Sequence, residues 1–446
     1  MSRCGLSSAD PVRAALGATF HAEHGRLIAA LVQRFGAAQL DLIENAVQAA
    51  MLRALERWPR DGVPASPTGW LLRVAHNLAI DSVRRDHRLA ARAPLLADHD
   101  ADVLPDAALD STGGVAPRPT GKAVPTPLRA SPVDDELALM FLCCHPSLTR
   151  SAQLALTLKV ACGFTAPQIA LAFLSDERTI AQRLVRAKQR LRAAAVVFEL
   201  PGPDELPARQ DPLLDVIYLV FNEGHSPSDG AAAIKDELCD EALRLARLLA
   251  GAPRTATPAA DALAALVCFQ AARTPARVAD DGSLLLLAEQ DRTRWDPGLL
   301  AEGFAHLDRA ARGAVLTRFH LEAGIAACHA AAASYQATDW PQIAALYDVL
   351  RDQAPSPIVE VNRAVAIAMV AGAVAGLDEL DAIPERDLVA RYPYALAAYA
   401  ELHASLANLA EARDYLRRAL DHQPAAAQRR VLERKLAALG DGRASD

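Results

Sequence analysis

Residues 148–195 read LTRSAQLALTLKVACGFTAPQIALAFLSDERTIAQRLVRAKQRLRAAA, and this stretch organises the first half of the chain. Its middle part predicts a short helix that begins near Thr165, a good N-cap residue, with Pro167 in the first turn, where a missing N–H costs little. Ser175 and Asp176 then interrupt the pattern and offer a second helix cap. The pattern predicts two consecutive helices separated by a tight turn.

The second of these helices is expected from about residue 177 to residue 194. Its apolar residues recur at spacings of four, three and four, which is one face of a helix: Ile180, Leu184, Ala187 and Leu191. Its other positions carry basic and amide side chains against a single acid, Glu177, and these are Arg178, Gln182, Arg183, Arg186, Lys188, Gln189, Arg190 and Arg192.

Two short helices, a tight turn and a basic second helix are typical of a helix-turn-helix. Arg and Gln side chains form paired hydrogen bonds with guanine and adenine edges in the major groove, and further basic residues suit phosphates. The alternative is the solvated face of an ordinary bundle helix. That reading predicts acidic residues four positions from the Lys and Arg residues. Such acidic residues are scarce here, so the pattern favours nucleic-acid binding.

Composition limits the remaining possibilities. At 446 residues the chain has room for about two to four domains. It is 52% hydrophobic with few aromatic residues, and alternating β-branched runs are scarce, so we expect an all-α protein. The net charge of −7 means that any nucleic-acid surface is local. Scattered cysteines, no signal peptide and no long apolar run predict a cytoplasmic protein with no membrane contact.

The N-terminal part also reads as helical. Over residues 40–59 the apolar side chains at steps of four and three suggest one buried stripe, formed by Ile43, Val47, Met51, Leu55 and Trp58. A loop with prolines and glycines follows, and then comes a basic helix that begins near Trp70.

These residues resemble a known family. ENAVQAAMLRALERWP (44–59) and GWLLRVAHNLAIDSVRR (69–85) resemble regions 2.1 to 2.4 of bacterial sigma factors of the extracytoplasmic-function class. QIALAFLSDERTIAQRLVRAKQRL (168–191) resembles the helix-turn-helix of region 4. The resemblance covers roughly the first 200 residues and implies two small helical domains that bind core RNA polymerase and promoter DNA.

The resemblance also implies roles for individual residues. Core polymerase is expected on Glu44, Gln48 and Leu52, although Asn45 and Ala49 stand where the family often has acids. The −10 element would be read by Trp70, Arg73, Asn77, Asp81, Arg84 and Arg85. Trp70 is also a candidate for the hydrophobic core. The −35 duplex would be read by Arg178, Thr179, Gln182, Arg183, Arg186 and Arg190.

Three other segments invite a chemical reading. Adjacent Cys143 and Cys144, before His145, lack the spacing of zinc ligands and are expected in the core. The run FNEGH at 221–225 has a Glu/His pair but no third group at a recognisable spacing, so we expect packing around a turn. The arginines around Trp295 suggest a charged, hydrogen-bonded corner. We therefore predict no metal, no cofactor and no catalytic residue.

The second half resembles the long C-terminal extension of one subgroup of these sigma factors. QIAALYDVLRDQAP (342–355) and EARDYLRRALDHQP (411–424) share small, apolar and proline positions at a constant offset of 69 residues, about two tetratricopeptide repeats. Stacked helix pairs leave a concave surface, so we expect a protein or peptide partner in a groove.

The expected organisation is a sigma region 2 domain at 12–92, a flexible linker at 93–132, a region 4 domain at 133–196, a helical extension at 201–330 and tetratricopeptide-like repeats at 331–440. The predicted function is promoter recognition with core RNA polymerase, regulated by the extension. A conventional helix-turn-helix regulator with a ligand- or protein-sensing helical domain is the alternative.

Overall fold

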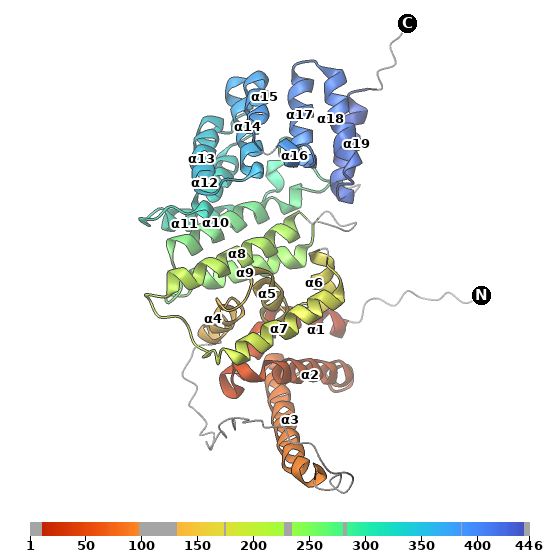
Figure 1. Ribbon diagram of the computed structural model, residues 1–446, viewed down its shortest axis with the longest axis vertical. Helices are drawn as coiled ribbons and strands as arrows, with labels where there is room; N and C mark the ends of the chain where they lie inside the picture. Colours follow the sequence, from red (N-terminus) through yellow and green to blue (C-terminus); the bar gives the residue numbers. More distant parts are fainter. Residues whose placement is uncertain are drawn as a thin grey trace, which may run out of the picture. The chain divides into compact units, whose positions relative to one another are not determined.

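The computed structural model describes residues 11–97, 132–173, 175–226, 234–279, 283–384 and 386–440, and these residues are helical nearly throughout (Figure 1). Within these ranges the β pairing is limited to one bridge between Val278 and Leu284. The predicted all-α class is therefore confirmed. Most of the expected linker at 93–132 lies outside the described residues.

The chain divides into two compact units. The first comprises residues 1–166 and 178–204, and the second comprises 167–177 and 205–446. The chain passes into the second unit between residues 166 and 167, at the start of the first helix of the predicted helix-turn-helix, and returns between residues 177 and 178, after the turn. The first helix of that motif therefore belongs to the second unit, and most of the second helix belongs to the first unit.

The described residues of the first unit form seven helical segments, and the sixth, α5, continues into a π-helical turn, η2. They are α1 (Pro11–Phe35), η1 (Ala37–Gln39), α2 (Leu40–Asp61), α3 (Pro67–Ala97), α4 (Pro132–Cys143), α5 (Arg150–Leu156) with η2 (Thr157–Ala161), and α7 (Glu177–Ala193). Helix α1 packs on α2, α3 and α4, and so joins the two modules that the sequence predicts.

The buried stripe of α2 differs from the predicted one. Ile43, Val47 and Trp58 are buried as expected, but Leu55 is 41% exposed, and the inner face is completed by Ala50 and Ala54. The reason is helical geometry: each four-residue step advances about 40° around the axis, so three successive steps drift about 120° away from the core. Small alanines then allow the neighbouring helices to approach closely.

Helix α1 and the segment around η2 approach each other closely at two glycines. A Cβ atom on Gly25 of α1 would lie 2.6 Å from the carbonyl oxygen of Ala161 in η2. Gly163 has a φ of +78°, which L side chains rarely adopt, and its Cβ would lie 2.9 Å from the ring of His24. The packing of α1 on η2 therefore requires glycine at both positions.

The second unit contains α6 (Ala166–Ala172), although its first residue is counted with the first unit, and the whole C-terminal half. Its helices are α8 (Leu206–His225), α9 (Asp236–Gly251), α10 (Pro258–Ala272), η3 (Thr274–Ala276), η4 (Leu287–Glu289), η5 (Arg292–Arg294), α11 (Pro297–Ala310), α12 (Arg318–Ala331), α13 (Trp340–Gln353), α14 (Pro357–Ala371), α15 (Ala373–Asp381), α16 (Arg386–Val389), α17 (Pro393–Ser405), α18 (Leu409–Asp421) and α19 (Ala426–Ala438).

Helix α10 is the centre of this unit. It is buried on nearly all sides and packs against α8, α9, α11 and α12. From α12 onward, successive helices pack mainly on their neighbours in the sequence, as Figure 1 shows for α13 to α15 and α17 to α19. The apolar positions shared by the two predicted repeat copies, such as Ile343 and Ala412, are buried. No helix in the described ranges is long and apolar enough to cross a bilayer.

Candidate nucleic-acid interface

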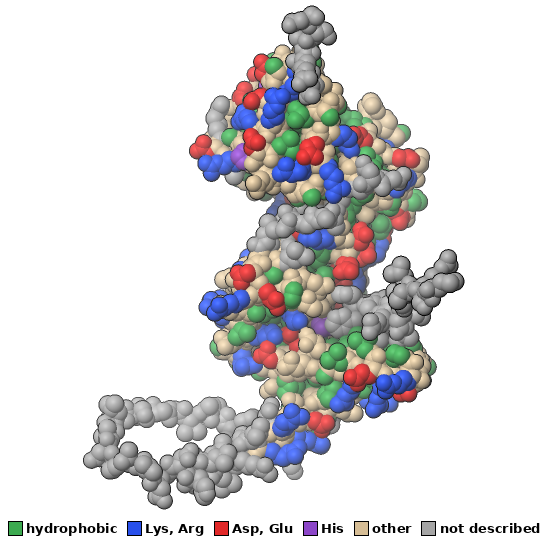
Figure 2. Space-filling view, turned by 90° about the vertical axis from the view of Figure 1, so that its right-hand side faces the viewer, with side chains coloured by type: hydrophobic (Ala, Val, Ile, Leu, Met, Phe, Trp, Pro, Cys, Tyr) green, Lys and Arg blue, Asp and Glu red, His purple; other side chains and the backbone are tan. Residues whose placement is uncertain are grey.

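Helix α3 presents one polar stripe to solvent. Its members recur every three or four residues, so they share a face, and all except Trp70 are exposed: Trp70, Arg73, Asn77, Asp81, Arg84 and Arg85. None of the three arginines forms an ion pair with a described residue. Figure 2 shows Lys and Arg side chains gathered at the lower end of the view, over α3, whereas both signs are mixed on most of the visible surface.

Trp70 packs on the core and is also partly exposed. Its ring lies edge-on to the buried ring of Trp58, with 5.6 Å between the centroids, so the core holds it in place. The residue as a whole is only partly buried, however, and it lies at the start of the stripe. A fixed, partly exposed aromatic ring is what base stacking requires.

Helix α7 has two basic faces with different surroundings. On the outer face, α7 and the start of α5 enclose a hollow of about 290 Å³. The predicted −35 side chains that line it are Thr179, Gln182, Arg183, Arg186 and Arg190, and α5 with its preceding residue adds Thr149 and Ser151, which the sequence did not single out. Arg178 is exposed but does not line the hollow.

The arginines of this outer face lack acidic partners. Among the described residues, Arg178, Arg183, Arg186 and Arg190 form no ion pair. Ion pairs within the protein would have weakened the attraction of these arginines for a polyanion. Because they form none with described residues, their charges remain available for phosphates and base edges.

The inner face of α7 is paired with α2. The Nζ atom of Lys188 lies 2.8 Å from Oδ1 of Asp41 and 2.8 Å from Oε1 of Glu44. Arg192 lies 3.4 Å from the other oxygen of Asp41 and donates to the carbonyl of Ala38 at 3.1 Å. Burial by itself lowers the pKa of Lys188, but the charge of Glu44 and hydrogen bonds to both acids hold that pKa above its ordinary value.

These contacts change how the predicted polymerase-binding residues are presented. Gln48 is exposed and Leu52 is 61% exposed, so both are open to a partner. Glu44 is only 6% exposed and is covered by Lys188. A partner that binds Glu44 must therefore displace α7 from α2. No local pattern predicted this contact, because the two helices are far apart in the chain.

The adjacent cysteines lie in the core of the first unit. Cys143 and Cys144 are both fully buried, and the thiol of Cys144 lies 3.6 Å from the hydroxyl of Thr157. Burial raises the pKa of Cys143 well above its usual range, so its thiol stays protonated. In the described part of the chain, no group of three or more His, Cys, Asp or Glu side chains is arranged to hold a metal ion.

The run FNEGH forms the last turn of α8 rather than a loop. Glu223 pairs with Lys235 at 2.7 Å. A Cβ atom on Gly224 would lie 2.8 Å from the backbone nitrogen of Cys239, so glycine allows α8 to approach α9. The predicted packing role fits both residues, and they lie within a helix rather than at a turn.

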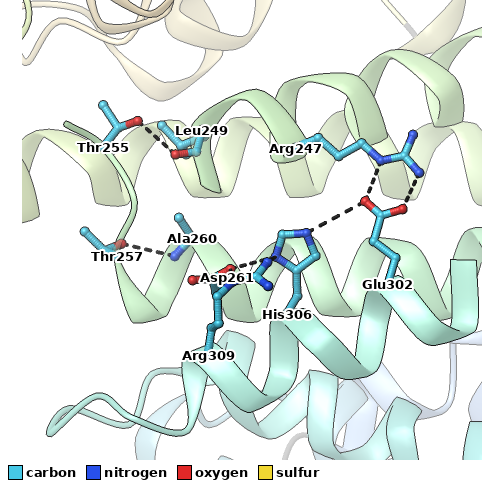
Figure 3. Close-up of polar contacts among 9 residues, drawn as sticks. All are labelled: Arg247, Leu249, Thr255, Thr257, Ala260, Asp261, Glu302, His306 and Arg309. Carbon is cyan, nitrogen blue, oxygen red and sulfur yellow. Dashed lines mark hydrogen bonds and ion pairs between the residues drawn. The ribbon is translucent and has the colours of Figure 1, made fainter. Parts of the chain in front are cut away.

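A chain of polar contacts joins α9, α10 and α11 (Figure 3). Arg247 forms two hydrogen bonds with Glu302, at 2.7 and 2.6 Å. Nδ1 of His306 lies 2.6 Å from Asp261, which also accepts a hydrogen bond from Arg309 at 2.9 Å. An Asp–His pair is also the orienting half of a catalytic triad.

The contacts of His306 favour a structural role over a catalytic one. Its Nε2 atom faces Glu302 at 3.8 Å, and no hydroxyl or thiol of a described residue is bonded to it. The hydrogen bonds from Arg247 lower the pKa of Glu302, so this acid stays ionised and the network holds three helices together.

Comparison with known proteins gives three results. A family model described as Sigma-70 region 2 matches residues 20–89, and one described as a family of unknown function (DUF6596) matches residues 209–311. The chain is 38% identical over 401 residues to a protein of Rhizobium meliloti (strain 1021) described as "Uncharacterized protein R00370", which covers 88% of this chain and 90% of that protein. No solved structure matches the chain.

The α2–α7 contact predicts a specific stability change. Replacing Lys188 by Met leaves Glu44 buried without a partner, which should cost about 3–5 kcal/mol of unfolding free energy. Arg186→Met, on the outer face of the same helix, should change it by no more than about 0.5 kcal/mol. Urea unfolding followed by circular dichroism measures both. Equal losses in the two variants would show that the ion pair has no special role.

The network in Figure 3 predicts a second difference. Asp261→Ala removes the shared acceptor of His306 and Arg309, and should cost about 1–3 kcal/mol. Asp308→Ala is the matched control, because Asp308 is exposed on α11, and its loss should stay within about 0.5 kcal/mol. Calorimetric melting of the full chain tests this, and similar melting temperatures for both variants would contradict a structural role for the network.

Proposed function

The chain belongs to the RNA polymerase sigma-70 family and carries a DUF6596 extension, and we propose that it is an alternative sigma factor of the extracytoplasmic-function class that acts in the cytoplasm. Family membership makes core RNA polymerase and promoter DNA its partners. The observation that carries the finer proposal is the outer face of α7, where four arginines stand without acidic partners in a chain of net charge −7.

The proposed mechanism consists of binding steps and involves no covalent chemistry. Helix α7 enters the major groove of the −35 element, with Gln182, Arg183 and Arg186 toward base edges and Arg178 and Arg190 toward phosphates. The stripe of α3 holds the −10 strand, and capture of its unstacked bases on Trp70 drives local melting.

Core polymerase docks on α2 through Glu44, Gln48 and Leu52 in this proposal. Because Lys188 covers Glu44, docking and separation of α2 from α7 are one coupled event. Polymerase must therefore bind the separated arrangement more tightly than the paired one. Separation also frees Lys188 and Arg192, which lie on the helix that is offered to the −35 element.

The extension is proposed to regulate these steps. From α13 to α19 most helices pack on the helix before and the helix after, as in a tetratricopeptide-like stack. The apolar side chains Ile358, Val374 and Tyr394 are exposed on them. A protein or peptide partner in a groove of this stack is the means of control that we favour.

Co-purification with bacterial core polymerase, followed by run-off transcription on genomic fragments, tests the proposal. Binding together with promoter-specific transcripts is the expected result. A chain that binds DNA fragments but neither binds polymerase nor supports transcription would instead be a conventional helix-turn-helix regulator.

Arg183 and Arg178 should differ in how they affect promoters. Arg183→Ala should cost about 1–3 kcal/mol at one −35 base pair and relax the preference there, because it removes a contact with a base edge. Arg178→Ala should weaken binding on every sequence and reduce the salt slope by about one, as expected for a phosphate contact. Binding to a set of single-base promoter variants at several salt concentrations measures both effects. A uniform loss for Arg183→Ala would place it on phosphate.

A chain that ends at residue 204, the boundary of the second unit, should differ strongly from the full chain in promoter output. The direction reports the role of the extension: higher output means restraint, and lower output means activation. Run-off transcription at equal polymerase occupancy measures the difference. Unchanged output would remove the regulatory part of the proposal.

A further inference from the structure

The extension contains a cavity of about 720 Å³, which is within the range of small-molecule sites. Helices α8, α10, α12 and α13 and the start of α14 contribute to its wall, and all of them belong to the second unit. Part of the wall lies within the DUF6596 match, and part comes from the helices that follow it. Nothing in the proposed promoter contacts uses this cavity.

One side of the cavity is cationic. Arg273 and Arg277 line it, and Arg292 lies close behind them. Arg273 donates to the side chains of Gln290 and Gln270 at 3.2 and 3.0 Å, and Arg277 donates to the carbonyl of His225 at 2.5 Å. All of these acceptors are neutral.

Arg292 is held in the same way. It donates to the carbonyls of His329 and Ala332 at 2.5 and 2.6 Å, and its second terminal nitrogen is buried without a hydrogen-bond partner. Its guanidinium lies 4.7 Å from the ring centre of Trp295. Within the described residues, none of the three arginines forms an ion pair with a carboxylate.

Gathering three arginines without a counter-charge is costly. Burial, together with the charges of Arg277 and Arg292, lowers the pKa of Arg273 to about 9. Burial lowers the pKa of Arg277 to about 10. Both side chains therefore stay protonated at pH 7, and the protein carries their mutual repulsion in a partly desolvated site. An anion in the cavity would relieve that repulsion.

Two histidines provide further hydrogen-bonding atoms on the same wall. The Nδ1 atoms of His225 and His329 are buried and have no partner among the described residues. Burial, with the nearby arginine charges, lowers the pKa of His329 to about 4, and the same causes lower the pKa of His225. Both rings are neutral at pH 7, so each offers a hydrogen bond without adding charge.

The rest of the wall combines polar and apolar side chains, and Phe221, Ile325 and Leu350 are buried along it. Arg318 also lines the cavity, but it forms an ion pair with Asp215. The one carboxylate among the described lining residues, Glu322, accepts a hydrogen bond from Tyr218 at 2.5 Å and is therefore engaged. We propose that the cavity binds a small organic anion, a carboxylate or phosphate on an apolar body, with its charged group against Arg273 and Arg277.

The test uses the full chain and simple probes. Phenyl phosphate and benzoate carry the two candidate charged groups, benzyl alcohol is the neutral control, and inorganic phosphate lacks the apolar body. We expect a saturable rise in melting temperature with at least one aromatic anion, and none with benzyl alcohol. The stronger of the two anions identifies the charged group. Binding is measured without polymerase, so a failed transcription assay leaves this result unaffected.

Two variants distinguish the cavity from general charge effects. Gln270→Glu places a carboxylate beside Arg273, so it should raise the melting temperature of the unliganded protein and weaken the probe on the order of tenfold or more. Arg273→Gln should abolish the response, and Arg294→Gln, on an exposed neighbouring arginine, should preserve it. Gln270→Glu remains informative if Arg273→Gln does not fold.

Three results would overturn the proposal. The first is no response to either aromatic anion. The second is a response of equal size in the Gln270→Glu variant. The third is an equal response to phenyl phosphate and inorganic phosphate, which would remove the apolar body from the proposal.

Discussion

The ion pair of Lys188 with Asp41 and Glu44 determines which face of α7 is free. The apolar stripe of α7 selects the side that is buried, and the ion pair with α2 fixes the rotation of the helix at the edge of that stripe. Lys188 is the base that follows Leu184 by one turn, so the apolar stripe and the ion pair lie on the same side. Once Lys188 is buried against Glu44, the arginines at 178, 183, 186 and 190 must point away.

The same pair links the two modules of the first unit energetically. Lys188 and Glu44 are both largely buried, so their attraction is strong only while the two charged groups stay in contact. Removing one of them leaves the other as an unpaired buried charge, which strongly destabilises the fold. Such a contact resists partial opening. It therefore favours two arrangements, paired and separated, over a continuum.

The sequence predicted those features that depend on neighbours in the chain. The periodicity of Ile180, Leu184, Ala187 and Leu191 correctly predicted α7 and its buried face. The same kind of pattern on α2 wrongly predicted that Leu55 is buried, because steps of exactly four residues drift around a helix. It also missed the burial of Glu44, since Lys188 and Asp41 are 147 residues apart and no local pattern links them. The cavity was missed for the same reason: Arg277 lies in neither FNEGH nor the segment around Trp295, and only folding places its side chain against the carbonyl of His225.

The arginines without acidic partners fall into two physical classes. Those on α3 and α7 are mostly exposed, where water and salt weaken each charge, so they need a partner with many charges at regular spacing, as nucleic acid has. Arg273 and Arg277 lie in a recess where the effective dielectric is lower, so a single anionic group interacts strongly with both. An extended polyanion does not fit a recess of about 720 Å³. The same residue type therefore predicts a polymer on one unit and a small anion on the other.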